Sequence, residues 1–251
     1  MGITIITAGC GGIGAELTKH LLEKGHTVIP TTRDMKNGLA FIKKLGDIAE
    51  RCYPMCLELN NQDSIENFIN SVRMKYGKID NLINNAVCRD AILDAYEMDM
   101  QKWEEHYRVN VFGTAQLSAK VADELIIKNG SIVNISSFYS VNVPDNRVYE
   151  DGTIPTSLIY ASSKAALNYI TKYMAVRYAQ DNIIVNAILA GGVGDNLRQT
   201  DGFVDKYCYR TPMNKMAKIS DFNSAIDFFV SENNRYCTGQ LLAVDGGWGL
   251  L

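Results

Sequence analysis

The sequence predicts an α/β protein, a doubly wound parallel sheet between two layers of helices (α/β/α), folded as a single domain over residues 1–251. Two observations lead to this prediction. Apolar stretches of strand length alternate with stretches of helical periodicity, and no linker, repeat or low-complexity segment interrupts the alternation. Strands that alternate with helices of this length form βαβ crossovers, and ligands bind beyond the carboxyl ends of such strands.

The elements follow from runs of apolar and β-branched residues, each placed before a segment with the 3.6-residue period of an amphipathic helix. Strands are expected at 3–8, 27–32, 53–59, 79–84, 131–136, 183–189 and 240–244. Helices are expected near 13–24, 35–50, 62–76, 99–128, 158–180 and 221–231. Residues 138–157 and 190–214 follow two of the strands, so we expect them to form loops beside the ligand.

Composition excludes several classes of protein. Of the 251 residues, 47% are hydrophobic and 21% are charged, which is the balance of an ordinary globular chain. The net charge of −3 offers no basic footprint for nucleic acid, and no apolar run is long enough to span a bilayer. A strand that begins at Ile3 leaves no room for a signal peptide, so we expect a cytoplasmic protein without membrane or nucleic-acid partners.

The cysteines and histidines show no metal-binding pattern. The six cysteines form no CxxC pair and the three histidines are scattered, so no metal site is expected and the thiols are expected to be reduced. Cys10 precedes an expected helix N-terminus, a position that lowers the pKa of a thiol. It is either a reactive group or a small apolar side chain turned into the fold, and we favour the second.

The turn between the first strand and the first helix is rich in glycine. The stretch "TAGCGGIG", Thr7 to Gly14, places Gly9, Gly11, Gly12 and Gly14 in six residues. Each glycine weakens regular structure, so a cluster indicates a close approach of some other group to the backbone. Free N–H groups at a helix start attract an anion, and the turn is therefore predicted to hold a phosphate rather than to be a simple tight connection.

These residues resemble the short-chain dehydrogenases/reductases, whose turn carries TGxxxGxG. Thr7, Gly12 and Gly14 match that motif, and Ala8 stands where the family usually has a glycine; its methyl is expected to shift the turn slightly without excluding a pyrophosphate. Similar motifs follow in the family's order over nearly the whole chain: "NNAV" at 84–87, "RVNVFG" at 108–113, "IVNISS" at 132–137, "YASSK" at 160–164 and "CTGQLLAVDGGW" at 237–248. The resemblance implies a Rossmann-type sheet and hydride transfer between a nicotinamide cofactor and a carbonyl/alcohol pair.

Four residues are the candidate catalytic group. Tyr160 and Lys164 are four apart on an expected helix and therefore point the same way. An ammonium group ~5 Å from a phenol, at an effective dielectric near ~20, favours the phenolate by ~3 kcal/mol. The resemblance implies that Tyr160 is the general acid and base, that Ser137 polarises the same carbonyl oxygen, and that Asn110 holds a water that relays protons to Lys164.

The cofactor is expected to be NADP(H), with NAD(H) possible. NAD-selecting members of the fold place a carboxylate after the second strand, whereas here Thr32 is followed by Arg33, whose guanidinium suits a 2′-phosphate. The alternative is that Arg33 merely pairs with Asp34 at the surface. The residues expected to bind the cofactor are Thr7, Gly9, Gly11, Gly12, Ile13, Gly14, Thr32, Arg33, Glu58, Leu59, Asn85, Ala86, Tyr160, Lys164, Gly191 and Val193, and the contribution of Asp195 is left open.

The substrate prediction rests on the 22 residues between Ser137 and Tyr160, which are rich in polar side chains. A long loop at the mouth of a ligand site is often functional, and a polar lining suits a keto-sugar, a sugar nucleotide or another polyhydroxylated compound. The stretch "VPDNRVYEDGT" also resembles loops of family members from bacterial surface-sugar biosynthesis. The expected substrate-binding residues are Ser137, Tyr139, Arg147, Tyr149 and Tyr160; alternatively, the loop packs on a neighbouring subunit.

Two other functions remain open. A sugar-nucleotide epimerase or dehydratase shares the Tyr-x-x-x-Lys pattern, but the short chain and the glycine spacing disfavour it. A non-catalytic nucleotide-sensing protein would keep the fold, yet it has no need of an intact catalytic group. The resemblance further implies a homodimer or homotetramer that associates through the helices near 99–128 and 158–180.

Overall fold

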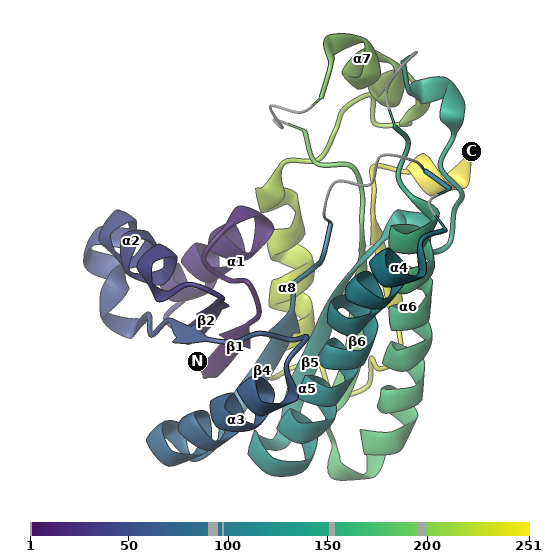
Figure 1. The fold of residues 1–251 in the computed structure, drawn as a ribbon. Helices are drawn as coiled ribbons and strands as arrows, with labels where there is room; N and C mark the ends of the chain where they lie inside the picture. Colours follow the sequence, from purple (N-terminus) through teal and green to yellow (C-terminus); the bar gives the residue numbers. More distant parts are fainter. Residues whose placement is uncertain (1, 90–94, 97, 151–153, 195–198) are drawn as a thin grey trace.

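The computed structural model describes residues 2–89, 95–96, 98–150, 154–194 and 199–251. Its centre is a parallel sheet of seven strands in the order β3-β2-β1-β4-β5-β6-β7, covered by helices on both faces (Figure 1). The order reverses between β1 and β4, which is the point where doubly wound sheets bind ligands. The predicted α/β/α fold is thereby confirmed.

The first half of the sheet consists of β1 (Ile3–Ile6), β2 (Thr27–Thr32), the two-residue edge strand β3 (Met55–Cys56) and β4 (Ile79–Asn84). These strands alternate with α1 (Gly12–Glu23), α2 (Met35–Leu45) and α3 (Gln62–Tyr76). The helix expected at 35–50 ends earlier, because Gly46 adopts a positive φ of 59° and a 3₁₀ segment, Gly46–Arg51, follows.

The second half contains β5 (Ile126–Ser137), β6 (Ile184–Ala190) and β7 (Leu241–Val244). The long helical stretch before β5 is α4 (Met100–Tyr107), a π-helical segment (Arg108–Gly113), α5 (Thr114–Lys120) and a second π-helical segment (Val121–Leu125). It is followed by α6 (Leu158–Tyr178) and α8 (Asn223–Val230). The segment 190–214, expected to be loop, contains a further helix, α7 (Asp201–Arg210).

Two apolar cores lie on opposite faces of the sheet. One core joins the strands to α3, α5 and α6, through residues such as Phe68, Leu117 and Met174. The other joins them to α1 and α8, through residues such as Leu17 and Phe229. No helix among the described residues combines the length and the apolar character that crossing a membrane requires.

A third, smaller core lies at the carboxyl end of β5. Phe138, Tyr139, Tyr207, Met216 and Trp248 pack together there. The ring of Phe138 meets the ring of Trp248 edge-on, with centroids 4.8 Å apart. This cluster joins the end of β5, helix α7 and the C-terminal turn, and it therefore holds these three segments together at the carboxyl end of the sheet.

Candidate active site

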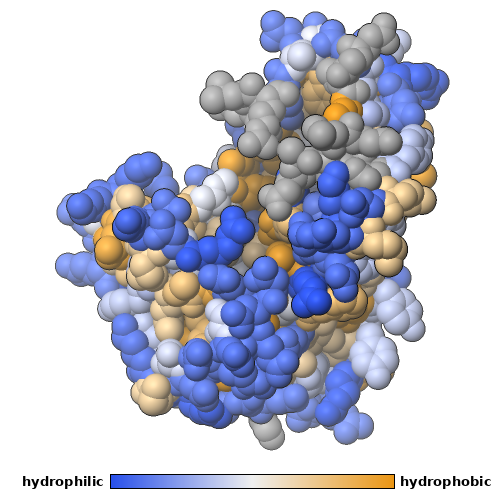
Figure 2. Space-filling view, viewed as in Figure 1, coloured by the Kyte–Doolittle hydropathy of each residue, from blue (hydrophilic) through white to orange (hydrophobic). Residues whose placement is uncertain are grey.

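A cleft of about 1630 Å³ opens at the carboxyl ends of the central strands. Its walls come from the β1–α1 turn, the start of α2, the segments after β4 and β5, helix α6 and the segment after β6. Figure 2 shows the molecule hollowed between the α2 side and the α4 side, with apolar residues deep in the hollow and hydrophilic residues around it. The sequence predicted a ligand at this end of the strands.

The glycine turn supplies open backbone at one wall of the cleft. A Cβ added at Gly11 or Gly12 would meet no atom within 4 Å, so each glycine leaves space in the cleft that a bound group could fill. Gly9 and Gly14 serve packing instead, because a Cβ would lie 2.6 Å from Pro30 Cβ or 2.6 Å from Asn85 Nδ2. The turn precedes the N-terminus of α1, and it therefore fits a pyrophosphate.

Ala8 is strained in this turn. Its φ is +50°, in the left-handed region that favours glycine. At this φ the methyl group makes the backbone conformation itself costly, by ~1–2 kcal/mol. The backbone N–H of Ala8 donates to Thr31 Oγ1 at 3.1 Å, which helps to hold the turn against β2.

Thr7 connects the turn to the segment after β4. Its side-chain oxygen accepts hydrogen bonds from the backbone N–H groups of Asn85 and Ala86, each at 2.9 Å, and Asn85 Nδ2 donates to the Thr7 carbonyl at 3.0 Å. Thr7 is buried and does not line the cleft, whereas Asn85 and Ala86 do. Thr7 thus positions residues of the lining and does not itself face a ligand.

The end of the cleft beside β2 and α2 carries two cations. Thr32, Arg33 and Lys44 line it, together with Ile13, Asn37, Leu57, Leu59 and Asn60. Arg33 is exposed and forms no ion pair with any described carboxylate, so the alternative pairing with Asp34 does not occur. Asp34 instead caps α2, accepting from the Lys36 N–H at 2.8 Å. Glu58, expected to bind the cofactor, is exposed and outside the lining.

The opposite end contains Tyr160 and Lys164. Ser157 caps α6 by accepting from the Tyr160 N–H at 3.3 Å, and one turn later Lys164 Nζ lies 6.0 Å from the centroid of the Tyr160 ring. Lys164 is buried, and its Nζ donates to the Ile135 carbonyl at 2.7 Å. Burial lowers the pKa of Lys164 to about 7, helped by the positive charge of Arg89. This lowered pKa weakens the positive charge that the sequence argument assumed for Lys164.

Ser137 ends β5 and faces the same cleft as Tyr160. Its Oγ accepts the Tyr139 N–H at 3.2 Å and keeps its own proton for another acceptor. Ser136 also borders the cleft, but its Oγ donates to Asn168 Oδ1 at 2.7 Å on α6. The hydroxyl of Ser137 is therefore the one oriented toward a ligand.

Asn110 lies in the π-helical segment between α4 and α5 and is buried. Its Oδ1 accepts from the Cys88 N–H at 2.7 Å, and its Nδ2 donates to the Cys88 carbonyl and to Ser163 Oγ, at 3.2 and 3.1 Å. These bonds tie the segment after β4 to α6. The side chain does not line the cleft, so its observed role is to hold the two walls at a fixed separation.

Aromatic side chains dominate the substrate side of the cleft. Tyr139 and Tyr149 line it and share a hydrogen bond of 3.2 Å between their phenol oxygens. Phe203 and Tyr207 reach it from α7, and the Tyr207 oxygen accepts from the Gly192 N–H at 2.7 Å. Sequence reasoning missed this pair, although apolar residues at 203, 204, 207 and 208 have helical spacing.

Most charged residues of the 138–157 loop are occupied elsewhere. Arg147 is 87% exposed and lies outside the cleft lining, where its guanidinium makes two bonds of 2.9 and 2.8 Å to Asp145. Asp145 also pairs with Arg210 Nε at 3.1 Å, and Glu150 accepts from the Thr200 hydroxyl. The sequence placed Arg147 beside the substrate, but the structure does not bring it there. Gly191 and Val193 do line the cleft, and Asp195 lies outside the described residues.

Cys10 lines the cleft, but burial raises the pKa of its thiol to about 11. The helix N-terminus does not outweigh the loss of solvent, so the reactive interpretation is not supported. Among the described residues, no group of three His, Cys, Asp or Glu side chains could hold a metal ion.

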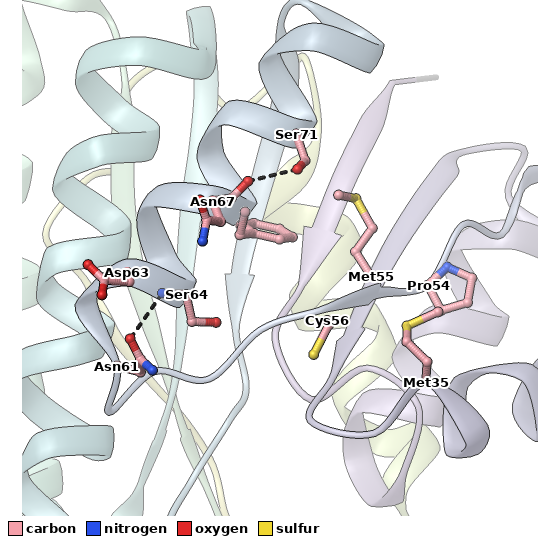
Figure 3. A pocket seen from close by; sticks show the side chains of 10 residues that line it. Met35, Pro54, Met55, Cys56, Asn61, Asp63, Ser64, Asn67 and Ser71 are labelled. Atoms are coloured by element: carbon pink, nitrogen blue, oxygen red, sulfur yellow. Dashed lines mark hydrogen bonds between the residues drawn. The ribbon is translucent and has the colours of Figure 1, made fainter.

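A second, shallower hollow of about 560 Å³ lies beside the edge strand β3 (Figure 3). Met35, Pro54 and Met55 face the side chains of α3 across it. The polar groups of α3 serve the helix itself: Asn61 caps it by accepting from the Ser64 N–H at 3.1 Å, and Ser71 donates to the Asn67 carbonyl at 2.7 Å. This hollow has no arrangement for chemistry, so the large cleft is the candidate site.

Comparisons with known proteins agree with this geometry. The family model described as Enoyl-(Acyl carrier protein) reductase matches residues 8–249. The chain is 30% identical over 249 residues to the 3-oxoacyl-[acyl-carrier-protein] reductase FabG of Thermotoga maritima, covering 98% of this chain and 96% of that protein. It is 30% identical over 259 residues to the 7alpha-hydroxysteroid dehydrogenase of Clostridium sardiniense, covering 99% and 93%.

Among solved structures, a short chain dehydrogenase from Leptospira borgpetersenii with bound NAD+ is 29% identical and superposes with a TM-score of 0.83, covering 98% of this chain and 92% of that one. The family match over nearly the whole chain accords with the cleft that holds Ser137, Tyr160 and Lys164. The chain therefore belongs to the short-chain dehydrogenases/reductases, oxidoreductases that interconvert a carbonyl and an alcohol with NAD(P).

Proposed function

We propose that this protein is an NADP(H)-dependent oxidoreductase of a hydroxylated carbonyl compound, with Tyr160, Ser137 and Lys164 as its catalytic group. The observation that carries the proposal is that the Tyr160 phenol and the Ser137 hydroxyl line one cleft, with the Lys164 ammonium buried beside them. The bound nicotinamide supplies the hydride for carbonyl reduction or accepts it in the reverse reaction.

In the reductive direction, Ser137 donates a hydrogen bond to the carbonyl oxygen and polarises it. Tyr160 transfers its phenol proton to that oxygen as negative charge develops there. Lys164, held at the Ile135 carbonyl, lies 6.0 Å from the centroid of the Tyr160 ring, so its positive charge favours the resulting phenolate. In the oxidative direction, the Tyr160 phenolate removes the alcohol proton.

Two cations at the β2 end support a preference for NADP(H). Arg33 lacks a carboxylate partner among the described residues, and Lys44 lines the same part of the cleft. Asp34 could repel a phosphate, but its carboxylate is engaged by the start of α2. A guanidinium binds a phosphate through paired, charge-assisted hydrogen bonds, and the ammonium of Lys44 adds a second positive charge.

For the substrate we again propose a keto-sugar, a sugar nucleotide or a related polyhydroxylated ring, but the supporting residues differ from those that the sequence suggested. The charged loop residues that first suggested it do not line the cleft, but the phenols of Tyr139 and Tyr149 do. Tyrosine combines an apolar ring face with a hydroxyl group, and a pair of them can pack against a ring while bonding its hydroxyls. Thr156, which shares a 3.2 Å bond with the Tyr149 hydroxyl, extends this polar strip.

The test is to incubate the purified protein with NADPH or NADH and a panel of carbonyl compounds that includes keto-sugars, steroid ketones and flat apolar ketones. Consumption of NADPH with a keto-sugar, reduced by Tyr149→Phe, supports the proposal. Steroid or apolar ketones as good substrates and no turnover of keto-sugars would refute the substrate class. Cofactor binding without turnover of any compound would favour the nucleotide-sensing alternative, and redox-neutral conversion of a sugar nucleotide would favour the epimerase.

The outer faces of the long helices support assembly into a homo-oligomer. Tyr169, Tyr173 and Val176 of α6 are 71%, 66% and 81% exposed at helical spacing, and Phe112 is 61% exposed beside α5. Apolar surface of this kind is typical of protein–protein interfaces. Light scattering should give the mass of a dimer or tetramer for the wild type and a smaller mass for Tyr173→Asp.

A further inference from the structure

The cleft has positive charge at both ends. Arg33 and Lys44 stand at the β2 end, while Arg89 and Lys164 stand at the end that contains Tyr160. The first pair has a ready partner in the 2′-phosphate of the proposed cofactor. The second pair does not, because Lys164 is buried and bonded to a backbone carbonyl, whereas Arg89 is exposed to the cleft.

Arg89 has no carboxylate within ion-pair distance in the part of the chain that the structure describes. Its guanidinium carbon lies 4.9 Å from the centroid of the Tyr160 ring, so it stacks on the catalytic phenol. Glu105 also lines the cleft, but it accepts a weak bond from Gln101 Nε2 at 3.4 Å and does not pair with Arg89. Three arginines outside the cleft do have carboxylate partners: Arg73 pairs with Glu124, and Arg147 and Arg210 pair with Asp145.

The stacking of Arg89 is weaker than the contact this group could make with an anion. A cation over an aromatic face at an exposed site is held only weakly, because the attraction to the ring quadrupole is small beside that of a formal negative charge. A guanidinium with a phosphate or carboxylate forms paired, charge-assisted bonds in a fixed fork, about twice as strong as neutral hydrogen bonds. Arg89 and Lys164 also repel each other, which contributes to the lowered pKa of Lys164. An anion beside Arg89 would relieve that repulsion.

We propose that the substrate carries an anionic group, a phosphate or a carboxylate, which Arg89 binds next to Tyr160. The proposal rests on the function proposed above and narrows its substrate class to phosphorylated or acidic hydroxylated compounds. The anion anchors the substrate on the side of the Tyr160 ring that Arg89 covers, and the carbonyl then lies between Tyr160 and Ser137. Arg89 is a binding residue in this scheme and exchanges no proton.

The experiment compares wild type, Arg89→Met and Arg89→Lys on matched pairs of carbonyl compounds: a phosphorylated ketose with its unphosphorylated parent, and a keto acid with its methyl ester. We expect the wild type to prefer one anionic member by at least ~10-fold in kcat/KM, equivalent to ~1.4 kcal/mol. Arg89→Met should abolish that preference through KM, while Arg89→Lys keeps part of it. The preferred pair identifies phosphate or carboxylate as the group. Arg147→Met, an exposed arginine already paired with Asp145, is the matched control and should change nothing.

A second arm separates this proposal from the proposed function. Inorganic phosphate and oxalate are titrated into the protein at saturating NADPH, with NADPH fluorescence as the readout. Anion binding that is lost in Arg89→Met supports the proposal even where no carbonyl compound is turned over, an outcome that would refute the proposed function alone. Three results would overturn the proposal: no anion binding and no anionic preference, equal losses for charged and neutral substrates, or a weakened affinity of Arg89→Met for NADPH, which would make Arg89 a cofactor contact.

Discussion

The two ends of the cleft are built in different ways. The β1–α1 end consists of backbone. Gly11 and Gly12 leave open space at a helix start, and the Thr7 side chain accepts a hydrogen bond from the Asn85 N–H, which ties the turn to the segment after β4. The substrate end consists of side chains: Tyr139, Tyr149 and Tyr207 line it, and they come from the end of β5, the loop after it and helix α7. A backbone site depends on local sequence and recurs as a short motif, whereas contacts between side chains of distant segments depend on the tertiary fold and leave no local motif.

The largest effect should follow from Tyr160→Phe. The change removes the proton but keeps the ring, so turnover should fall at least ~10²-fold, the low end for a positioned acid/base. Affinity for NADPH should remain within a few-fold, because the glycine turn lies at the other end of the cleft. Steady-state assays measure turnover, and fluorescence titration measures the affinity for NADPH. Tyr236→Phe, at an exposed tyrosine outside the cleft lining, is the control, and undiminished turnover in Tyr160→Phe would rule out the mechanism.

Lys164→Met at the substrate end should change both the pH dependence of stability and the activity. The pKa of Lys164 is lowered from 10.5 to about 7, so the unfolded chain binds more protons between these values and the stability of the wild type rises with pH across that window. Between pH 7 and pH 8 the free energy of unfolding should increase by ~1 kcal/mol. Above pH 8 the raised pKa values of the Cys10 and Cys52 thiols oppose this trend, so the comparison is made below it. Lys164→Met should lose this slope along with activity. The exposed Lys172→Met should keep the slope, and a flat wild-type profile in denaturant titrations would contradict the lowered pKa.

At the other end, Arg33→Ala should weaken NADPH binding by ~10-fold while NADH binding changes little, because NADH lacks the 2′-phosphate. Turnover at saturating NADPH should stay close to that of the wild type, which is the reverse of Tyr160→Phe. Lys43→Ala removes an exposed charge on the neighbouring helix α2, outside the cleft lining, and serves as the control. Equal losses for both cofactors would end the NADP(H) assignment.

The difference between the two ends also explains what could be predicted from sequence. Alternating strands and helices predicted the sheet and its ligand edge. Recognisable motifs allowed five residues that line the cleft to be predicted: Gly11, Gly12, Ser137, Tyr160 and Lys164. Arg147 lies outside the lining because a carboxylate two residues away, Asp145, holds it. Local sequence does not reveal that pairing, nor that α7 would bring Tyr207 to Gly192.

Arg89 is the opposite case to Arg147: sequence reasoning did not single it out, yet it lines the cleft. Its sequence neighbours carry no signal for a catalytic contact, and it meets Tyr160 only because β4 ends and α6 begins at the same edge of the sheet. A residue that gains its role from tertiary proximity needs the structure to be found.

The smallest effect should come from Ala8→Gly, which tests whether the turn is limited by its backbone. Ala8 has a φ of +50°, where an L-residue with a Cβ costs ~1–2 kcal/mol and glycine does not. Glycine is more flexible in the unfolded chain, which offsets ~0.4–1 kcal/mol of that gain. Ala8→Gly should therefore stabilise the protein by ~0.5–1 kcal/mol, or raise Tm by ~2 °C for a chain of this size. Ala15→Gly, inside α1, should have the opposite sign because glycine weakens a helix interior by ~1 kcal/mol. If both variants destabilise the protein equally, the positive φ of Ala8 carries no cost, and the turn is set by the contacts of Thr7 and Gly14 rather than by its backbone conformation.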